Sequence, residues 1–149
     1  MKPVSFRIDC IPPKSTHQAS LRIMKRRDGS QFVGKMENSK GAQVKRDIIS
    51  LLAEHRPAEP FAGPVQLVIG WAYPWRKSEP KRNRITGQRW CDTRPDCDNL
   101  AKMVIDCMTR LAFWGDDSQV AWLNFSKWWA DRPGIIVGIR ELEEGGNDS

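Results

Sequence analysis

Apolar residues recur along this chain with two different periods, and these periods predict strands and helices in alternation. Period-two alternation and short buried apolar runs predict strands over residues 3–10, 63–73, 120–128 and 134–140. A hairpin is expected over residues 20–35, because turn residues at 27–30 separate two short apolar runs. Two segments, about 38–56 and 100–111, have the period of amphipathic helices. The chain is therefore predicted to be an α+β protein in which a small mixed sheet packs with two main helices.

Two segments lack any such period. Residues 76–94 carry many charges, which predicts a long loop. Residues 141–149 are acidic and rich in Gly and Asn, which predicts a flexible tail. The rest, residues 1–140, is predicted to form a single domain, as expected for a chain of 149 residues.

The composition argues against membrane and secreted proteins. No stretch approaches the roughly 18 apolar residues of a membrane helix, and the N-terminus lacks the apolar region of a signal peptide. We therefore expect no membrane partner and a cytoplasmic location. The 4 cysteines form no C-x-x-C pair and have no histidine nearby, so they are predicted to be free thiols rather than zinc ligands.

Positive charge is concentrated in two blocks. The net charge is +6, yet residues 21–46 hold 8 basic and 2 acidic residues, and residues 71–94 hold 7 and 2. Aromatic residues are interleaved with the second block, and guanidinium and indole groups together suit a polyanion whose bases can stack. The same block fits a solvated loop beside an aromatic strand, and Trp75 and Trp90 fit either base stacking or core packing. The DNA-binding candidates are Lys25, Arg26, Arg27, Arg76, Lys77, Lys81, Arg82, Arg84 and Arg89.

The candidate chemistry lies between Arg94 and Val120. Pro95 favours an extended backbone before it, and if that conformation continues, Asp96 and Asp98 point to the same side. Two carboxylates so placed repel each other unless a cation lies between them, and Mg²⁺ or Mn²⁺ prefers such oxygen ligands. A plainer interpretation makes Asp98 the N-cap of the following helix and Asp96 an exposed turn residue.

Further charged residues follow at helical spacing. Lys102, Asp106 and Arg110 continue from Asp98 at intervals of four, and ion pairing on a helix surface explains this stripe without a catalytic role. Alternatively, Lys102 stabilises the negative charge that develops on a phosphate. The residues Gly115-Asp116-Asp117 are first of all a turn sequence.

Taken together, the run from Asp96 to Val120 resembles the RusA family of Holliday junction resolvases, small endonucleases of bacteria and prophages. The resemblance rests on D-C-D-N-x-x-K-x-x-x-D followed by F-W-G-D-D-S-Q-V, and it is strongest over residues 94–129. It implies a RusA-like fold and a homodimer that depends on Mg²⁺, or alternatively Mn²⁺. Such a dimer cuts branched DNA, the four-way junction, by paired incisions.

The resemblance also assigns roles to residues. The family's essential residues would fall on Asp96, Asp98, Lys102 and Asp117. The three aspartates would hold the metal, and the lysine would offset charge at the phosphate. Asp116 and Asp106 match further acidic positions; the role of Asp116 stays open, and we interpret Asp106 as a surface ion-pair partner. The tryptophan-rich region 71–94 and the acidic tail have no secure counterpart in the family.

The predicted helix raises the question of how these aspartates meet. A helix from Asn99 to Leu111 rises about 20 Å at about 1.5 Å per residue, so Asp117 begins at the opposite end from Asp98. Either residues 112–117 double back along the helix, or Asp117 completes the site of the other subunit. We hypothesise the second arrangement.

Three functions are compatible with the sequence. The chain is a junction-resolving nuclease, a metal-dependent nuclease of the same fold that acts on other branched or single-stranded DNA, or a non-catalytic basic protein that binds DNA structure. In the last case the aspartates are only caps and turns. The complete acidic set argues against that case, because carboxylates near phosphate would weaken a pure DNA binder.

Overall fold

The computed structural model describes residues 2–12, 20–25, 27–36 and 39–143. Its strands are β1 (Val4–Ile8), β2 (Ser20–Lys25), β3 (Gln31–Met36), β4 (Val65–Pro74), β5 (Gln88–Trp90), β6 (Val120–Ala130) and β7 (Gly134–Glu141). Its helices are α1 (Ser39–Ala53), the short α2 (Lys81–Arg84) and α3 (Cys97–Arg110), with a single 3-10 turn, η1 (Asp117–Gln119).

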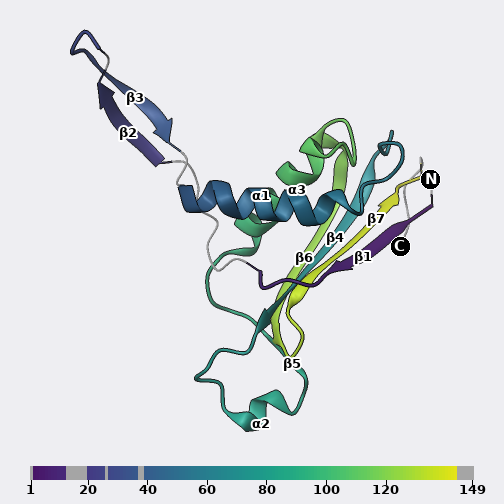
Figure 1. The fold of residues 1–149 in the computed structure, drawn as a ribbon. Helices are drawn as coiled ribbons and strands as arrows, with labels where there is room; N and C mark the ends of the chain where they lie inside the picture. Colours follow the sequence, from purple (N-terminus) through teal and green to yellow (C-terminus); the bar gives the residue numbers. More distant parts are fainter. Residues whose placement is uncertain (1, 13–19, 26, 37–38, 144–149) are drawn as a thin grey trace.

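Five strands form one sheet in the order β1-β7-β4-β6-β5 (Figure 1). β4 and β6 run parallel, and the other neighbouring pairs are antiparallel. Because parallel neighbours need a crossover, the chain leaves β4 at one end of the sheet, returns through α3 and enters β6 at the other end. The start of α3 and the turn η1 are therefore directed to opposite ends of the sheet.

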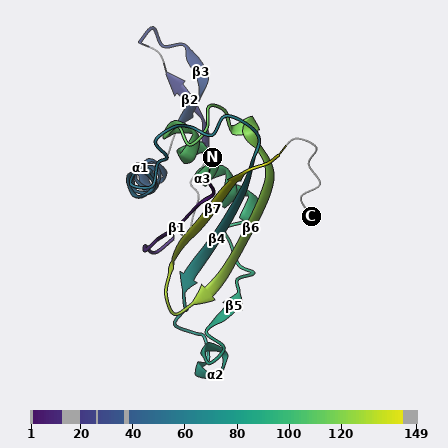
Figure 2. The same cartoon turned by 90° about the vertical axis from the view of Figure 1, so that its right-hand side faces the viewer.

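Both long helices lie on one face of the sheet and pack against each other (Figure 2). On β4, Leu67, Ile69, Trp71 and Tyr73 alternate toward this face and are buried. They join the apolar stripe of α3 in one core cluster. Burying each large apolar side chain contributes about 1.5–3 kcal/mol, so this layer holds α3 firmly on the sheet.

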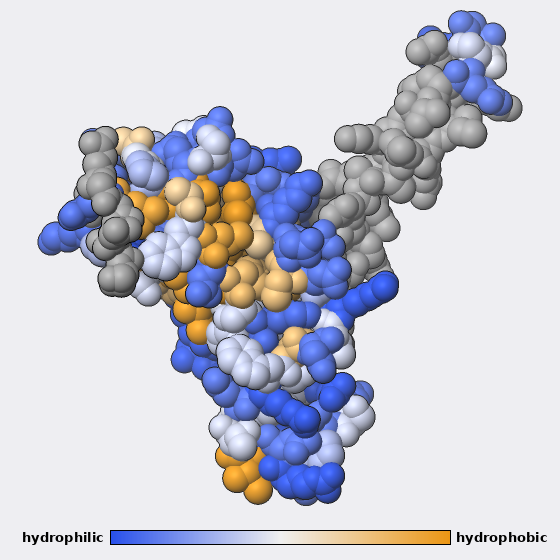
Figure 3. Space-filling model, turned by 180° about the vertical axis from the view of Figure 1, so that it is seen from behind, coloured by the Kyte–Doolittle hydropathy of each residue, from blue (hydrophilic) through white to orange (hydrophobic). Residues whose placement is uncertain are grey.

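The opposite face of the sheet carries none of the described helices. Val68 and Trp122 on this face are 40% and 41% exposed. Figure 3 shows apolar side chains gathered on the same side of the molecule. Gly70 lies beneath the Trp128 ring here, and a Cβ at this position would stand 2.4 Å from a ring carbon.

The predicted strands, hairpin and long helices are confirmed, with ends that differ by a few residues. The long loop predicted over residues 76–94 is wrong, because this segment contains α2 and β5, and β5 pairs with β6. The predicted tail begins too early: Glu141 belongs to β7, and the Leu142 N–H donates to the Pro64 carbonyl at 2.8 Å. Residues 144–149 lie outside the described residues.

Two predictions from composition can be compared with the structure. Within the described ranges, each helix is too short or too polar to cross a bilayer. The cysteines Cys10, Cys91, Cys97 and Cys107 are free, as predicted. Burial raises the pKa of the Cys107 thiol to about 11, so it stays protonated at neutral pH as a core residue.

Candidate functional site

The first two candidate aspartates stand at the start of α3. Asp96 is the N-cap residue, with φ −73° and ψ 147°, and Asp98 lies in the first helical turn. An extended backbone through Asp98 is therefore wrong, and so is Asp98 as the N-cap, because the helix begins at Cys97. The two carboxylates still leave the chain at the same helix end, where the partial positive charge of the helix N-terminus stabilises negative charge.

The carboxylates at this end are available to a ligand. Asp96 and Asp98 are exposed, and the Asp96 side chain makes no capping hydrogen bond. Lys102 is also exposed and follows Asp98 by one helical turn, so the two side chains share a face of α3. An acidic pair with a lysine one turn away can hold a divalent cation and contact a phosphate bound to it.

The ion-paired stripe predicted along α3 does not form. Ion pairs form elsewhere in the described residues, for example on Asp9 and Glu79, and none joins two of Asp98, Lys102, Asp106 and Arg110. Asp98 is therefore not paired with Lys102, and Asp106 is not paired with Arg110. Exposed pairs of this kind contribute little in any case, since long side chains lose entropy and water screens the charges.

The third candidate, Asp117, lies in the turn that leads from α3 into β6. Asp116 caps η1 by accepting a hydrogen bond from the Ser118 N–H at 2.9 Å. The Gln119 side chain makes hydrogen bonds with four backbone groups: it accepts from the N–H groups of Gly115 and Asp116 and donates to the carbonyls of Phe61 and Gly63. Gln119 thus fastens this turn to the segment before β4 and gives Asp117 a defined position.

Asp117 stands among other acidic groups. A hydrogen bond with the Asp116 carboxyl raises the pKa of Asp117, and desolvation and the charges of Asp116 and Asp106 raise it further. Asp106 is therefore not an ion-pair partner on the helix surface. Its negative charge instead helps to raise the pKa of Asp117. Neighbouring carboxylates that repel one another are stabilised by a bound cation.

The two acidic groups lie at opposite ends of the sheet. Lys127, near the end of β6, donates to the carbonyls of Thr93 and Pro95, at 2.7 Å for Pro95, and ties the start of α3 to that end. Asp117 comes just before Val120, where β6 begins. The seven residue-to-residue steps along β6 from Val120 to Lys127 span roughly 23 Å at about 3.3 Å each.

The length of α3 is similar to that length of β6. From Asp98 to Arg110 the helix rises about 18 Å. Within the described residues, no three His, Cys, Asp or Glu side chains converge as a metal site. The donor chemistry nevertheless fits a hard cation, because exposed carboxylates stand at both ends of α3. One subunit thus carries two acidic groups, Asp96 with Asp98 at the start of α3 and Asp117 with its acidic neighbours after the end of this helix.

The basic candidates of the first block lie at the β2–β3 hairpin. Lys25 ends β2, Arg27 is exposed at the turn, and Arg26 lies outside the described residues. The turn is stabilised by Asp28, whose carboxylate accepts from the Ser30 N–H at 2.9 Å and its hydroxyl at 2.6 Å. The hairpin projects away from the sheet (Figure 1).

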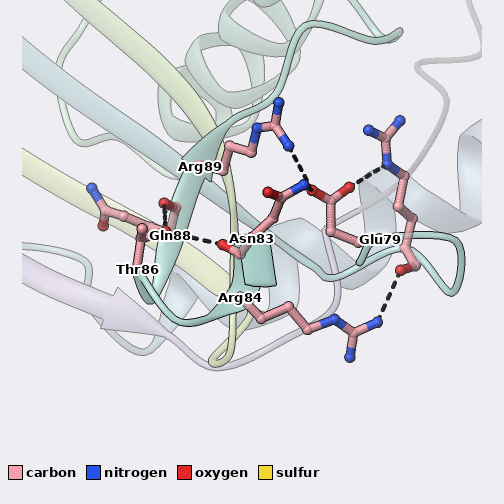
Figure 4. A network of polar contacts seen from close by, with 7 residues as sticks. Glu79, Asn83, Arg84, Thr86, Gln88 and Arg89 are labelled. Atoms are coloured by element: carbon pink, nitrogen blue, oxygen red, sulfur yellow. Dashed lines mark hydrogen bonds and ion pairs between the residues drawn. The ribbon is translucent and has the colours of Figure 1, made fainter. Parts of the chain in front are cut away.

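The second block folds around one buried acid. Glu79 is only 5% exposed and accepts hydrogen bonds from Arg76, Asn83 and Arg89 at 2.8–2.9 Å (Figure 4). Hydrogen bonds from these side chains, that of Arg76 above all, lower the pKa of Glu79 to about 2, so it is ionised at neutral pH. We call this folded segment, residues 75–94, the basic module.

The Glu79 network divides the basic candidates of the module. Arg76 and Arg89 pair with Glu79, and Arg84 donates to the Arg76 carbonyl at 3.2 Å, so these three arginines build the module. Of the DNA-binding candidates in the module, Lys77, Lys81 and Arg82 are exposed and take no part in this network. Trp90 is 70% exposed, so it is not a core residue.

Three residues that shape the site were not among the sequence candidates. Glu79 is one of only 2 acidic residues in the basic block of residues 71–94, and this was its only signal in the sequence. Gln119 belonged to the recognised motif but had no assigned role. Lys127 had no signal, because its partners lie about 30 residues away in the chain and only the fold brings them together.

Comparison with known proteins places this arrangement in a family. The family model for endodeoxyribonuclease RusA matches residues 3–140. The uncharacterized protein YqaN of Bacillus subtilis (strain 168) is 32% identical over 143 residues, which cover 91% of this chain and 99% of that protein. The crossover junction endodeoxyribonuclease rusA of Lactococcus phage r1t is 33% identical over 91 residues, 61% of this chain and 66% of that one. This chain therefore belongs to the RusA endodeoxyribonuclease family.

Proposed function

We propose that this chain is a metal-dependent Holliday junction resolvase that acts as a homodimer and makes paired incisions in four-way DNA junctions. The observation that carries the proposal is the exposed group of Asp96, Asp98 and Lys102 beside a basic module, in a member of an endodeoxyribonuclease family. The similarity to a phage protein named as a crossover junction endodeoxyribonuclease supports the choice of substrate.

In the proposed reaction, Asp96, Asp98 and Asp117 would hold Mg²⁺, or alternatively Mn²⁺. When bound, this ion would act as a Lewis acid, which lowers the pKa of a water molecule and stabilises negative charge on a leaving oxygen. Lys102 offsets the negative charge that develops on the phosphate. Exposed Lys77, Lys81 and Arg82 hold the phosphates of a junction arm by charge attraction.

We further propose that each site is shared between two subunits. A pair of antiparallel α3 helices about a two-fold axis brings the start of one helix to the η1 turn of the other. What supports this arrangement is that Asp98 lies in the first turn of α3, that Asp117 follows the last turn of the same helix in η1, and that no three His, Cys, Asp or Glu side chains of the described residues converge within one subunit. Two composite sites related by the axis would make the paired incisions.

The proposal is tested with a synthetic four-way junction and the purified protein. We expect symmetric nicks in Mg²⁺ that disappear when EDTA removes the metal. Preferential cutting of a single-stranded or three-armed substrate would favour a related metal nuclease. Tight binding without any cleavage in Mg²⁺ or Mn²⁺ would favour the non-catalytic DNA-binding alternative.

Reversing one exposed charge of the basic module should weaken junction binding. Arg82→Glu removes a cation without touching the Glu79 network, so we expect a several-fold loss of affinity. The slope of log affinity against log salt should flatten by about one unit for each phosphate that the variant no longer neutralises. Arg56→Glu, an exposed change beyond the end of α1, is the matched control. Equal salt slopes for the two variants would show that the module does not face DNA.

A further inference from the structure

A pocket beside the start of α3 has no part in the proposed metal site. It encloses about 330 Å³ where β4, β6 and the basic module meet. Its walls include three aromatic residues, Tyr73, Trp75 and Trp129, and three basic ones, Arg76, Lys77 and Arg94. This volume is at the lower end of the range for small-molecule sites, so the pocket fits one compact ring system.

The aromatic walls are held in place by specific contacts. The rings of Tyr73 and Trp129 are 5.9 Å apart between centroids and inclined by 55°. The Trp75 indole N–H donates to the Asp131 carboxylate at 2.7 Å. The Arg76 guanidinium lies 5.5 Å from the centre of the Trp129 ring, at cation–π distance. These side chains are therefore already held in place, so a flat ligand does not have to order them when it binds.

The charged residues that line the pocket are all basic. Among the described residues that line it, three are basic and none is acidic. Arg76 is already paired with Glu79, whereas Lys77 and Arg94 are exposed at the rim. Aromatic walls with a basic rim suit a ring that carries a phosphate, because the walls stack on the ring and the cations neutralise the phosphate.

The pocket lies next to the proposed chemistry. Thr93 and Arg94 line it, and Asp96 follows only two residues later. Lys127 holds the intervening backbone through the carbonyls of Thr93 and Pro95. A nucleotide seated in the pocket would therefore be a close neighbour of a phosphate held at Asp96.

We propose that this pocket receives a nucleobase unstacked from the DNA beside the scissile phosphate. The inference rests on the proposed function and adds to it a site for selecting the nucleotide at the cut. Stacking between Trp75 and Trp129 stabilises the extruded base, and Lys77 and Arg94 hold its phosphate. Bases at a junction's crossover have fewer stacking partners than those in a continuous duplex, so their extrusion costs less there.

The test uses wild-type protein on junctions in which an abasic site replaces, one at a time, each nucleotide flanking the cleaved bond. Losing the base that occupies the pocket should slow cleavage about tenfold, the scale of one base–aromatic stack. Trp75→Ala should slow cleavage of the intact junction to a similar extent and cause no further loss on that abasic junction. Trp75→Phe should restore most of the rate.

A binding measurement in EDTA separates the pocket from the chemistry. The fluorescent base 2-aminopurine, placed at each flanking position in turn, should change its emission on binding at one position, and Trp75→Ala should abolish that change. Trp122→Ala, which removes an exposed tryptophan from the open sheet face, is the matched control. No emission change at any position, or no abasic position that slows cutting, would overturn the pocket proposal. Failure of the intact junction to be cut in Mg²⁺ would instead overturn the proposed function.

Discussion

Asp98→Asn is expected to reduce junction cleavage on the order of 10³-fold while leaving junction binding nearly unchanged. The change replaces the carboxylate by an uncharged amide of the same shape, so the proposed metal site loses a charged ligand. Asp98 is exposed and takes part in no ion pair of the described residues, so its loss leaves the core of α3 intact. The proposed chemistry, and not the fold, should therefore bear the effect.

The measurement is single-turnover nicking of a four-way junction in Mg²⁺, with binding measured separately in EDTA. Asp47→Asn is the matched control, because Asp47 is also an exposed helical aspartate but lies on α1. Urea denaturation of both variants checks the fold. Cleavage by Asp98→Asn at the wild-type rate would exclude Asp98 from the catalytic residues. Cleavage that persists in EDTA would show that the reaction does not need the metal.

Mixing two inactive variants should restore activity if the sites are composite. Asp98→Asn and Asp117→Asn subunits each lack one half of the site. In a mixed dimer, one site combines both defects and the other combines two intact halves. Random mixing makes about half of the dimers mixed, so about a quarter of all sites are intact. We expect single nicks at roughly a quarter of the wild-type rate in place of paired incisions.

The geometry supplies a matched control for this experiment. Asp96 and Asp98 stand at the same end of α3, so Asp96→Asn mixed with Asp98→Asn leaves every site with a defect. That mixture should stay inactive. If the Asp98→Asn and Asp117→Asn mixture also stays inactive after subunit exchange is verified, the shared site is wrong. Asp117 would then need another route to the metal.

Local patterns in the sequence predicted much of the fold. The apolar stripe of α3, with Met103 and Cys107 among its members, is buried as its period indicated. The strands β4 and β7 were equally clear, because buried apolar runs and turn residues mark them directly. The start of α3 was predicted too late, since Cys97 and Asp98 have no apolar period and the helix is continued over them by its own hydrogen bonds.

Local sequence patterns did not predict the structure of the basic module. Its strand β5 has only three residues, all exposed, and exists through pairing of Gln88, Arg89 and Trp90 with β6. Its buried Glu79 is charged and would be expected at the surface. Two arginines from different parts of the module make its burial favourable, and no local period records that arrangement.

By itself, the sequence determined the order of the long helices and the longer strands, the core face of each long helix and the acidic residues that carry the proposed chemistry. These depend on residue types at short, fixed spacings, which the chain shows directly. Only the tertiary structure decided that the start of α3 and the η1 turn are directed to opposite ends of the sheet, that Lys127 anchors the start of that helix, and that three aromatic side chains line a pocket beside it. The reason is physical: the parallel pairing of β4 with β6 brings together residues far apart in the chain and also sets how far apart the two acidic groups lie.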